Sequence, residues 1–405
     1  MSALPSHATA DAPTATLIRD DAHALAVARE LAARFAPGAA ERDRQRSLPF
    51  AEIDRYAQSG LWGLAVPRAF GGPAVSHLTL SEVTALISEA DPAIGQIPQN
   101  HHCLVDAIRL VGTPEQQRFF FAEALAGRRF GNAVSETGTA NAKVVKTRLA
   151  RTPGGLRLDG RKAYSTGALF AHWVPVAALD DEGRQVLVFV ERHAPGLMVE
   201  DDWNGFGQRT TASGTVIADN VAVTPLQVVA RHRLFEPPTI HGAFAQLLHS
   251  AIDLGIARAA LADLRHWVRE RARPWADSGV AHAAQDPLTL SRVGELVIRL
   301  HAAELLQERA AGHLDTARDD AGAASVTEAS IAVAEAKVAT TQIALDASSS
   351  LIELGGTQST LAEHNLDRHW RNARTHTVHD PLRWKFHAVG DFWLNGTAPR
   401  RHASL

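Results

Sequence analysis

The chain has 405 residues, of which 45% are hydrophobic and 21% charged, and its formal net charge is −3. This length favours two or three domains, each with its own core. The dispersed lysines and arginines give no electrostatic footprint for nucleic acid, so we expect a small-molecule substrate. Cys103 is the single cysteine, which excludes an intrachain disulfide and a cysteine-ligated metal cluster and fits a cytoplasmic enzyme.

The first part of the chain is predicted to be a short tail followed by a helical domain. Residues 1–16 are rich in alanine, proline, serine and threonine, with no basic residue before an apolar run, so we predict a disordered tail rather than a signal peptide. Residues 17–129 show apolar positions recurring every three or four residues, which indicates helices. One helix start is explicit, because Thr113-Pro114-Glu115-Gln116 is a capping box with proline at the first helical position.

From about Phe130 the hydrophobic period changes to two, which indicates strands. We predict a central β domain, a compact barrel or sandwich, over residues 130–236. Helical patterns return in residues 237–405 as long alanine-rich segments that suit a helical bundle. The most apolar of these, from Ala251 to Leu264, is interrupted by charged residues, which argues against a membrane span. The predicted fold class is therefore α+β.

Three segments resemble the acyl-CoA dehydrogenase superfamily of flavoproteins. They are Gly131-Asn132-Ala133-Val134-Ser135-Glu136-Thr137, Leu354-Gly355-Gly356-Thr357-Gln358 and the run from Arg371 to Pro381. The resemblance covers nearly the whole chain from Leu17. It implies an N-terminal helical domain, a central β-barrel domain and a C-terminal four-helix bundle that assembles into a homotetramer.

The branch of the superfamily is indicated by the end of the third segment. Many members have Tyr-Glu-Gly-Thr after the final arginine, and the glutamate removes the substrate's α-proton. Here Val378-His379-Asp380-Pro381 takes that place, and Gln99-Asn100-His101-His102 stands far upstream. Both segments are similar to the flavin-dependent monooxygenase branch that includes dibenzothiophene monooxygenase and the sulfur-acquisition oxidoreductases.

That branch implies a specific chemistry and specific partners. Its members use reduced FMN delivered by a separate flavin reductase, and they activate O2 at the flavin C4a position as a (hydro)peroxyflavin. One oxygen atom then passes to a small organosulfur-type substrate. The chain has no complete dinucleotide fingerprint, since Gly205-Phe206-Gly207 lacks the third glycine, and this agrees with a separate reductase.

The resemblance assigns His101 and His379 to proton donation at the oxygenated flavin, a role that imidazoles can fill near physiological pH. Any single histidine among 20 is more often a surface or capping residue. His102 is expected to be structural. His376 and His379 are three apart, a spacing that could bind metal on a helix, but no HExxH motif or carboxylate pair completes such a site, so we predict none.

The predicted cofactor contacts come from four short polar or aromatic residues and one arginine. The first set could hold the flavin ring edge or the peroxide, and comprises Asn132, Thr166, Ser213 and, by stacking, Trp203. Arg271-Ala272-Arg273-Pro274-Trp275 resembles the family's Arg-x-Gln-Phe site, in which a neighbouring subunit reaches the flavin phosphate. The resemblance makes Arg273 the candidate for this phosphate, although Arg271 could serve instead. Trp203 could equally be a core aromatic, and Asn132 could cap a strand.

Two other functions stay open from the sequence. A conventional FAD-dependent acyl-CoA dehydrogenase would need Asp380 as its base. Aspartate is one methylene shorter than glutamate, and a displacement of about an ångström costs on the order of a hundredfold in rate. A non-catalytic scaffold with a flavoprotein-like fold is the third possibility, which the number of polar pocket residues disfavours.

Overall fold

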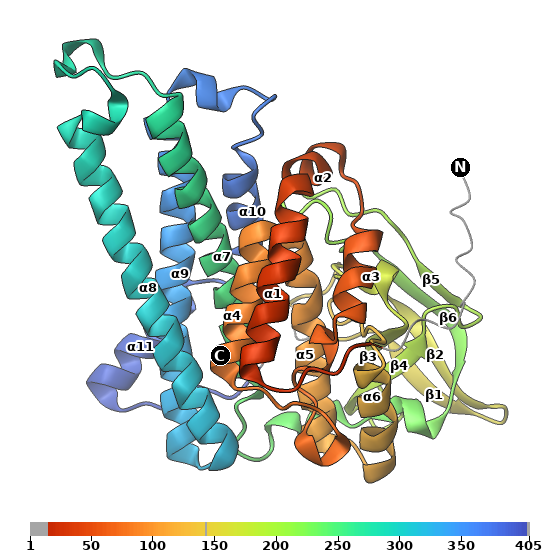
Figure 1. Cartoon of the computed structure of the whole chain (residues 1–405). Helices are drawn as coiled ribbons and strands as arrows, with labels where there is room; N and C mark the ends of the chain where they lie inside the picture. The colour runs from red at the N-terminus through yellow and green to blue at the C-terminus, as the bar shows by residue number, and fades with distance from the viewer. Residues whose placement is uncertain (1–14, 142–143, 403–405) are drawn as a thin grey trace.

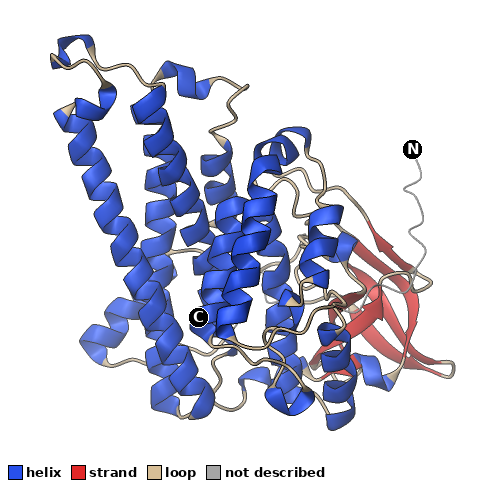
Figure 2. Cartoon of the chain, viewed as in Figure 1, coloured by secondary structure: helices blue, strands red, loops and turns tan. Residues whose placement is uncertain are grey.

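The computed structural model describes residues 15–141 and 144–402. The strands gather on one side of the molecule, the long C-terminal helices stand on the other, and the N-terminal helices lie between them (Figures 1 and 2). The order along the chain is helical, β and helical, which confirms the predicted α+β architecture.

Six helices make up the N-terminal part of the described chain. They are α1 (Asp21–Phe35), α2 (Ala39–Gln45), α3 (Phe50–Gln58), α4 (His77–Ala90), α5 (Pro92–Val111) and α6 (Pro114–Leu125). The predicted capping box is confirmed, because the Thr113 hydroxyl accepts the Gln116 N–H at 3.2 Å and the Gln116 side chain accepts the Thr113 N–H at 2.9 Å. Most of the predicted tail lies outside the described residues. Thr16 does not belong to it, since its N–H donates to the Gln58 carbonyl at 2.9 Å.

The central domain is a mixed sheet. Its seven described strands are β1 (Arg148–Thr152), β2 (Gly155–Lys162), β3 (Trp173–Leu179), β4 (Gln185–Glu191), β5 (Leu197–Val199), β6 (Val216–Val223) and β7 (Val228–Val229). The order is β5-β6-β2-β1-β3-β4-β7, with β1 and β3 parallel and the other pairs antiparallel. The described ladder therefore starts at β5 and ends at β7 instead of closing on itself as a barrel.

Strand β3 is buried on both faces, and this explains why alternation does not reveal it. Val174 and Val176 pack with the apolar residues of β4 and β6, whereas Trp173 and Ala177 face an aromatic cluster from α6 that includes Phe120. A strand covered on both sides reads as a continuous apolar run.

Three long helices form most of the C-terminal domain. They are α7 (His241–Glu270), α8 (Pro287–Asp319) and α9 (Ala323–Gly355), followed by the shorter α10 (Arg368–His376) and α11 (Arg383–Asn395). Helix α9 packs against the other four, and α4 of the N-terminal domain packs on α7. Buried alanines along α9 allow this close approach. Across residues 15–141 and 144–402, no helix combines the length and apolarity needed to cross a bilayer.

A buried ion pair joins the two ends of the chain. The Asp43 carboxylate of α2 accepts from the Arg371 guanidinium of α10 at 2.7 Å and 3.1 Å, and also from the Asn365 amide at 3.0 Å. Both charged side chains are largely buried. This contact fixes α10 against the N-terminal domain.

We expect Asp43→Asn to destabilise the fold. The substitution removes the buried partner of Arg371 and leaves only the exposed Asp367 carboxylate to compensate the guanidinium, which costs up to about 3 kcal/mol in the free energy of unfolding. Asp367→Asn is the matched control, because Asp367 pairs with the same arginine but is 57% exposed, and loss of an exposed pair costs roughly 0.5 kcal/mol. Thermal unfolding of both variants measures the difference, and equal midpoints would contradict the structural role of Asp43.

Candidate functional site

Gln208 links the β domain to α10. Its backbone N–H donates to the Asn372 side chain at 2.7 Å, and its carbonyl accepts from the Trp203 indole at 2.9 Å and from the Thr211 hydroxyl at 3.0 Å. A side chain at the preceding Gly207 would collide with the Arg371 carbonyl, 1.9 Å from the position of an added Cβ. The loop and the helix are therefore in backbone contact.

A chain of hydroxyl groups lies beside this junction. Ser213 shares hydrogen bonds of 2.7 Å with both Thr166 and Thr211, and all three side chains are buried. The backbone around them is strained, because Tyr164, Gln208 and Ala212 have left-handed φ values of 56°, 50° and 50°. Non-glycine residues in this region cost free energy and concentrate at functional sites.

Several buried polar atoms at this junction have no hydrogen-bond partner in the described part of the chain. They are both side-chain ends of Gln208, the Ser165 hydroxyl and the Thr375 hydroxyl. Gln208 and Ser165 are at most 2% exposed. An unpaired buried polar group costs about 1–3 kcal/mol, so such a concentration indicates a place where a polar ligand completes the hydrogen bonding.

The end of α10 brings three histidines together with one carboxylate. His376 Nδ1 lies 2.5 Å from Asp253 Oδ1, and His376 Nε2 lies 3.0 Å from His249 Nδ1. The ring of His249 also packs on the ring of His379, with centroids 4.0 Å apart. We call His249, His376 and His379 the histidine cluster.

The protonation of the histidine cluster is governed by burial and by neighbouring charge. Burial lowers the pKa of His249 well below its usual range, and the nearby imidazoles add to this effect. Desolvation, followed by the His376 imidazole, lowers the pKa of His379 to about 4, whereas Asp380 raises it. The His379 residue is exposed at the protein surface. At neutral pH both rings are uncharged.

His101, predicted to be catalytic, is placed in the protein core. Its Nδ1 accepts the Phe130 N–H at 3.1 Å, so Nε2 carries the proton and donates it to the Trp62 carbonyl at 2.8 Å. The side chain has no solvent exposure. Neither ring nitrogen is free to serve a bound group, and this geometry argues against the predicted role. His101 instead joins α5 to the start of the β domain.

The adjacent His102 has the opposite character. It is 1% exposed, and neither of its ring nitrogens has a partner among the described residues. Its neighbours on the same face of α5 contact α7, through Gln99 to the Ala245 carbonyl and Asp106 to His241. Burial lowers the pKa of His102 to about 3. The motif predicts a structural role for His102, but of these two histidines it is the one whose ring nitrogens are without a partner among the described residues.

The remaining predicted cofactor residues are spread more widely. Asn132 is half-buried between Phe130 and Ala133, which bridge to β3. Trp203 packs over Gly205 and lies edge-on to Tyr164, 6.3 Å between ring centroids. Arg273 is exposed in the connection between α7 and α8, at the end of these helices away from the sheet (Figure 1). The structure thus brings Thr166, Ser213 and Trp203 to the Gln208 loop but not Arg273.

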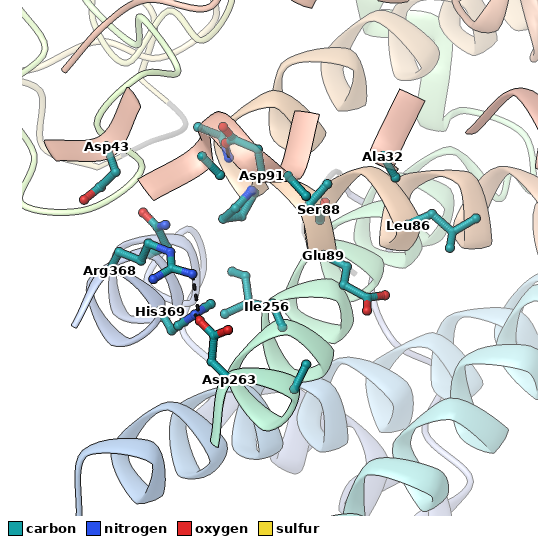
Figure 3. A pocket seen from close by; sticks show the side chains of 18 of the residues that line it. Ala32, Asp43, Leu86, Ser88, Glu89, Asp91, Ile256, Asp263, Arg368 and His369 are labelled. Carbon is teal, nitrogen blue, oxygen red and sulfur yellow. Dashed lines mark hydrogen bonds and ion pairs between the residues drawn. The ribbon is translucent and has the colours of Figure 1, made fainter. Parts of the chain in front are cut away.

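A cavity of about 430 Å³ lies between the N-terminal helices, α7 and α10 (Figure 3). Arg209 and Asn372 line it, so it adjoins the Gln208 loop. On its wall, Asp263 of α7 accepts hydrogen bonds from Arg368 at 2.7 Å and His369 at 2.8 Å. None of the seven predicted site residues lines this cavity.

Sequence reasoning missed Gln208, His249 and Asp253 as site residues. Gln208 stands in the motif Gln208-Arg209-Thr210-Thr211-Ala212-Ser213, but only its left-handed backbone and unpaired amide mark it out. A sequence signal for His249 and Asp253 was available. They lie four residues apart on one apolar helix, and residues at this spacing share a helix face, so a polar pair was to be expected there.

Models of one protein family match most of the chain. The N-terminal, middle and C-terminal domains of acyl-CoA dehydrogenase match residues 19–128, 132–221 and 247–384. The chain belongs to the acyl-CoA dehydrogenase family. Butyryl-CoA dehydrogenase from Megasphaera elsdenii shares the fold, with a TM-score of 0.81 at 18% identity over 93% of this chain and 98% of that one.

Within that family the chain falls in the flavin-dependent monooxygenase branch. A probable FMNH2-dependent monooxygenase from Pseudomonas putida is 33% identical, covering 93% of this chain and 96% of that protein. Dibenzothiophene monooxygenase from Rhodococcus qingshengii is 33% identical, covering 93% and 94%. Among solved structures, FMN-bound TdsC from Paenibacillus has a TM-score of 0.89 at 30% identity, covering 94% of this chain and all of that one.

The unpaired His102 predicts a pH-dependent stability. A depressed pKa means that the unfolded chain, whose histidine titrates near 6.5, binds the proton more readily than the folded protein. Stability is therefore retained above about pH 6.5 and falls as the pH drops toward the folded pKa, by on the order of 1–2 kcal/mol at pH 5. We expect His102→Gln to flatten the dependence of the thermal midpoint between pH 7 and pH 5.

His301→Gln, at an exposed position on α8, is the control and should keep the wild-type slope. The slope is the readout, because a change in the midpoint at pH 7 alone reports only altered packing. An unchanged slope in His102→Gln would mean that this ring is not held uncharged by the fold.

Proposed function

We propose that this protein is a two-component monooxygenase that uses reduced FMN from a separate flavin reductase, together with O2, to insert one oxygen atom into a small organosulfur substrate. The observation that carries the proposal is the end of α10, where the histidine cluster stands in place of a free carboxylate base. The relatives support it, since the most similar ones include an FMNH2-dependent monooxygenase and dibenzothiophene monooxygenases. We also place the enzyme in the cytoplasm, where a soluble reductase can deliver the flavin.

The alternative, an FAD-dependent acyl-CoA dehydrogenase, is less well supported. That reaction needs a carboxylate that is free to remove a proton from the substrate. Asp380 occupies the expected sequence position, but its carboxylate is largely buried and pairs with the Lys385 ammonium at 2.9 Å. A buried carboxylate that is engaged by an ammonium group is not free to reach a substrate proton.

The residues at the Gln208 loop fit a flavin. The unpaired Gln208 amide and the Ser165 and Thr375 hydroxyls offer donors and acceptors for a polar ring edge. The hydroxyl chain of Thr166, Thr211 and Ser213 can pass a hydrogen bond to the same ligand. When bound, reduced flavin supplies the two electrons for oxygen activation. The protein would exclude water and hold a proton on the histidine cluster, with His102 as a second available imidazole.

Arg273 would contact flavin only when several copies of the chain assemble. The α7–α8 connection stands away from the sheet of its own chain, so its arginine would serve the flavin of a neighbouring copy (Figure 1). Large apolar residues are exposed on the outer helices, which supports association as a homotetramer. They include Leu288 (80% exposed), Ile298 (69%), Trp393 (79%) and Leu394 (75%).

The phosphate contact can be tested with two flavins. We expect Arg273→Ala to weaken FMN binding roughly 10- to 100-fold, the value of one charge-assisted hydrogen bond, while binding of riboflavin, which has no phosphate, is unaffected. Arg271→Ala is the comparison variant and should bind both flavins normally. Flavin fluorescence titration measures the affinities, with the mass in solution checked by light scattering. Equal weakening for both flavins would assign Arg273 to packing.

The function itself is tested by reconstitution. Purified protein, FMN, NADH and a flavin reductase are incubated with dibenzothiophene or methanesulfinate under air, and we expect a product heavier by one oxygen atom that carries ¹⁸O from ¹⁸O2. Omitting the reductase should abolish the reaction. Tightly bound FAD that bleaches on addition of an acyl-CoA, without oxygenation of any sulfur compound, would favour the dehydrogenase instead.

A further inference from the structure

We propose that Asp253, His376 and His249 form a buried proton relay that sets the proton position of His249, the ring on which His379 packs. Asp253 anchors the relay from α7, His376 follows on α10, and His249 contacts the ring of His379, with centroids 4.0 Å apart. This inference rests on the proposed function, in which His379 serves the oxygen chemistry. It adds three positioning residues, each hydrogen-bonded to the next.

The Asp253 carboxylate is fully occupied and ionised. Its Oδ2 accepts from the Lys337 ammonium at 2.7 Å and from the Thr341 hydroxyl at 2.8 Å, and its Oδ1 faces His376 Nδ1 at 2.5 Å. None of its surface reaches solvent. Lys337 and then His376 hold the pKa of this carboxyl below its usual range despite its burial. An ionised carboxylate only accepts hydrogen bonds, so the proton between Asp253 and His376 sits on His376 Nδ1.

This fixes the order of donors along the relay. With Nδ1 protonated, a neutral His376 has only a lone pair at Nε2, and the 3.0 Å contact then requires His249 Nδ1 to donate. His249 is left with a bare Nε2 that can take up a proton. If His376 becomes an imidazolium beside Asp253, the contact reverses, and His249 Nε2 carries the proton instead. One added proton therefore switches the outer nitrogen of His249 from acceptor to donor.

Two ion pairs lie close to the relay. Asp253 is paired with Lys337 of α9, and Asp380 is paired with Lys385 at the start of α11. The four ionised groups form two neutral pairs around the three rings, so a proton on the relay is the uncompensated charge. Across residues 15–141 and 144–402, no set of His, Cys, Asp or Glu side chains is arranged to hold a metal ion. Two imidazoles joined by hydrogen bonds to an ionised carboxylate can pass a proton between them.

Helices α7 and α10 make a second Asp–His contact, in which the histidine is not hydrogen-bonded to a further histidine among the described residues. Asp263 of α7 accepts from His369 of α10 at 2.8 Å, but its other partner is Arg368. It lies ten residues along α7 from Asp253, about 15 Å at the helical rise. These two hydrogen bonds are sufficient for a carboxylate whose role is to join α7 to α10. Asp263→Asn is consequently the matched control, with the same substitution between the same helices.

The relay is tested first without flavin. The protein is labelled with ¹⁵N-histidine, and ring nitrogens are assigned with His376→Gln and His249→Gln. We expect His376 and His249 each to carry a proton at Nδ1. Asp253→Asn should change the tautomer of both rings, because the amide can present a donor where the carboxylate only accepts. Asp263→Asn should leave both unchanged. A His249 protonated at Nε2 in the wild type, or insensitive to Asp253→Asn, would overturn the relay.

Two further variants guard against misfolding, because Asp253→Asn leaves the buried Lys337 ammonium without its carboxylate partner. The double variant Asp253→Asn/Lys337→Met removes both charges, and His376→Gln interrupts the relay while the Asp253–Lys337 pair stays. The same tautomer change of His249 in either variant supports the relay even if Asp253→Asn does not fold. An unchanged His249 in both variants would refute it.

The reconstituted reaction supplies the second readout. Interrupting the relay should lower the rate of oxygenation roughly 100-fold or more, the usual contribution of a positioned acid or base, and divert the flavin to peroxide release. The Asp263→Asn control should keep both the flavin affinity and the oxygenation rate of the wild type. If the wild type oxygenates no sulfur compound, the proposed function fails, whereas the tautomers still decide the relay on their own.

Discussion

The C-terminal domain is organised around one carboxylate with no contact to water, Asp253. A buried charge is tolerated only when it is paired and hydrogen-bonded, and here the partners come from α9 and α10 while the carboxylate belongs to α7. The same bonds that neutralise Asp253 hold three helices in register. They also bring His376 against His249, and through it the ring of His379. The position of these imidazoles therefore depends on satisfying a single negative charge.

A second constraint joins this cluster to the β domain. Gly207 touches the backbone of α10, and Gln208 bonds to Asn372 one turn before His376. The loop reaches this position with left-handed residues at Gln208 and Ala212, so packing against α10 offsets the cost of its backbone. Because Thr211 and Ser213 follow directly, the hydroxyl chain and the histidine cluster share one rigid junction. Residues of both domains line this junction.

The sequence predicted the elements well where a local signal existed. The capping box at Thr113 and the long helices α7, α8 and α9 follow from spacing and composition, and family membership follows from a few motifs spread along the chain. Alternation failed for β3, because a strand covered on both faces has no polar side. Motif position could not separate the neighbouring His101 and His102 by the engagement of their ring nitrogens. Consecutive residues on a helix point about 100° apart, and only packing shows which one has free ring nitrogens.

The sequence by itself determined the order of the domains, the family, and the replacement of a glutamate base by His379 and Asp380. Each of these is carried by residue identity or by a short-range period, which survives without coordinates. The tertiary structure decided which groups are paired: that Asp380 is bound to Lys385, that His101 is engaged by backbone groups, and that Asp253 and His249 stand behind His376. The partners in these contacts come from separate segments, and only the folded chain brings them within hydrogen-bonding distance.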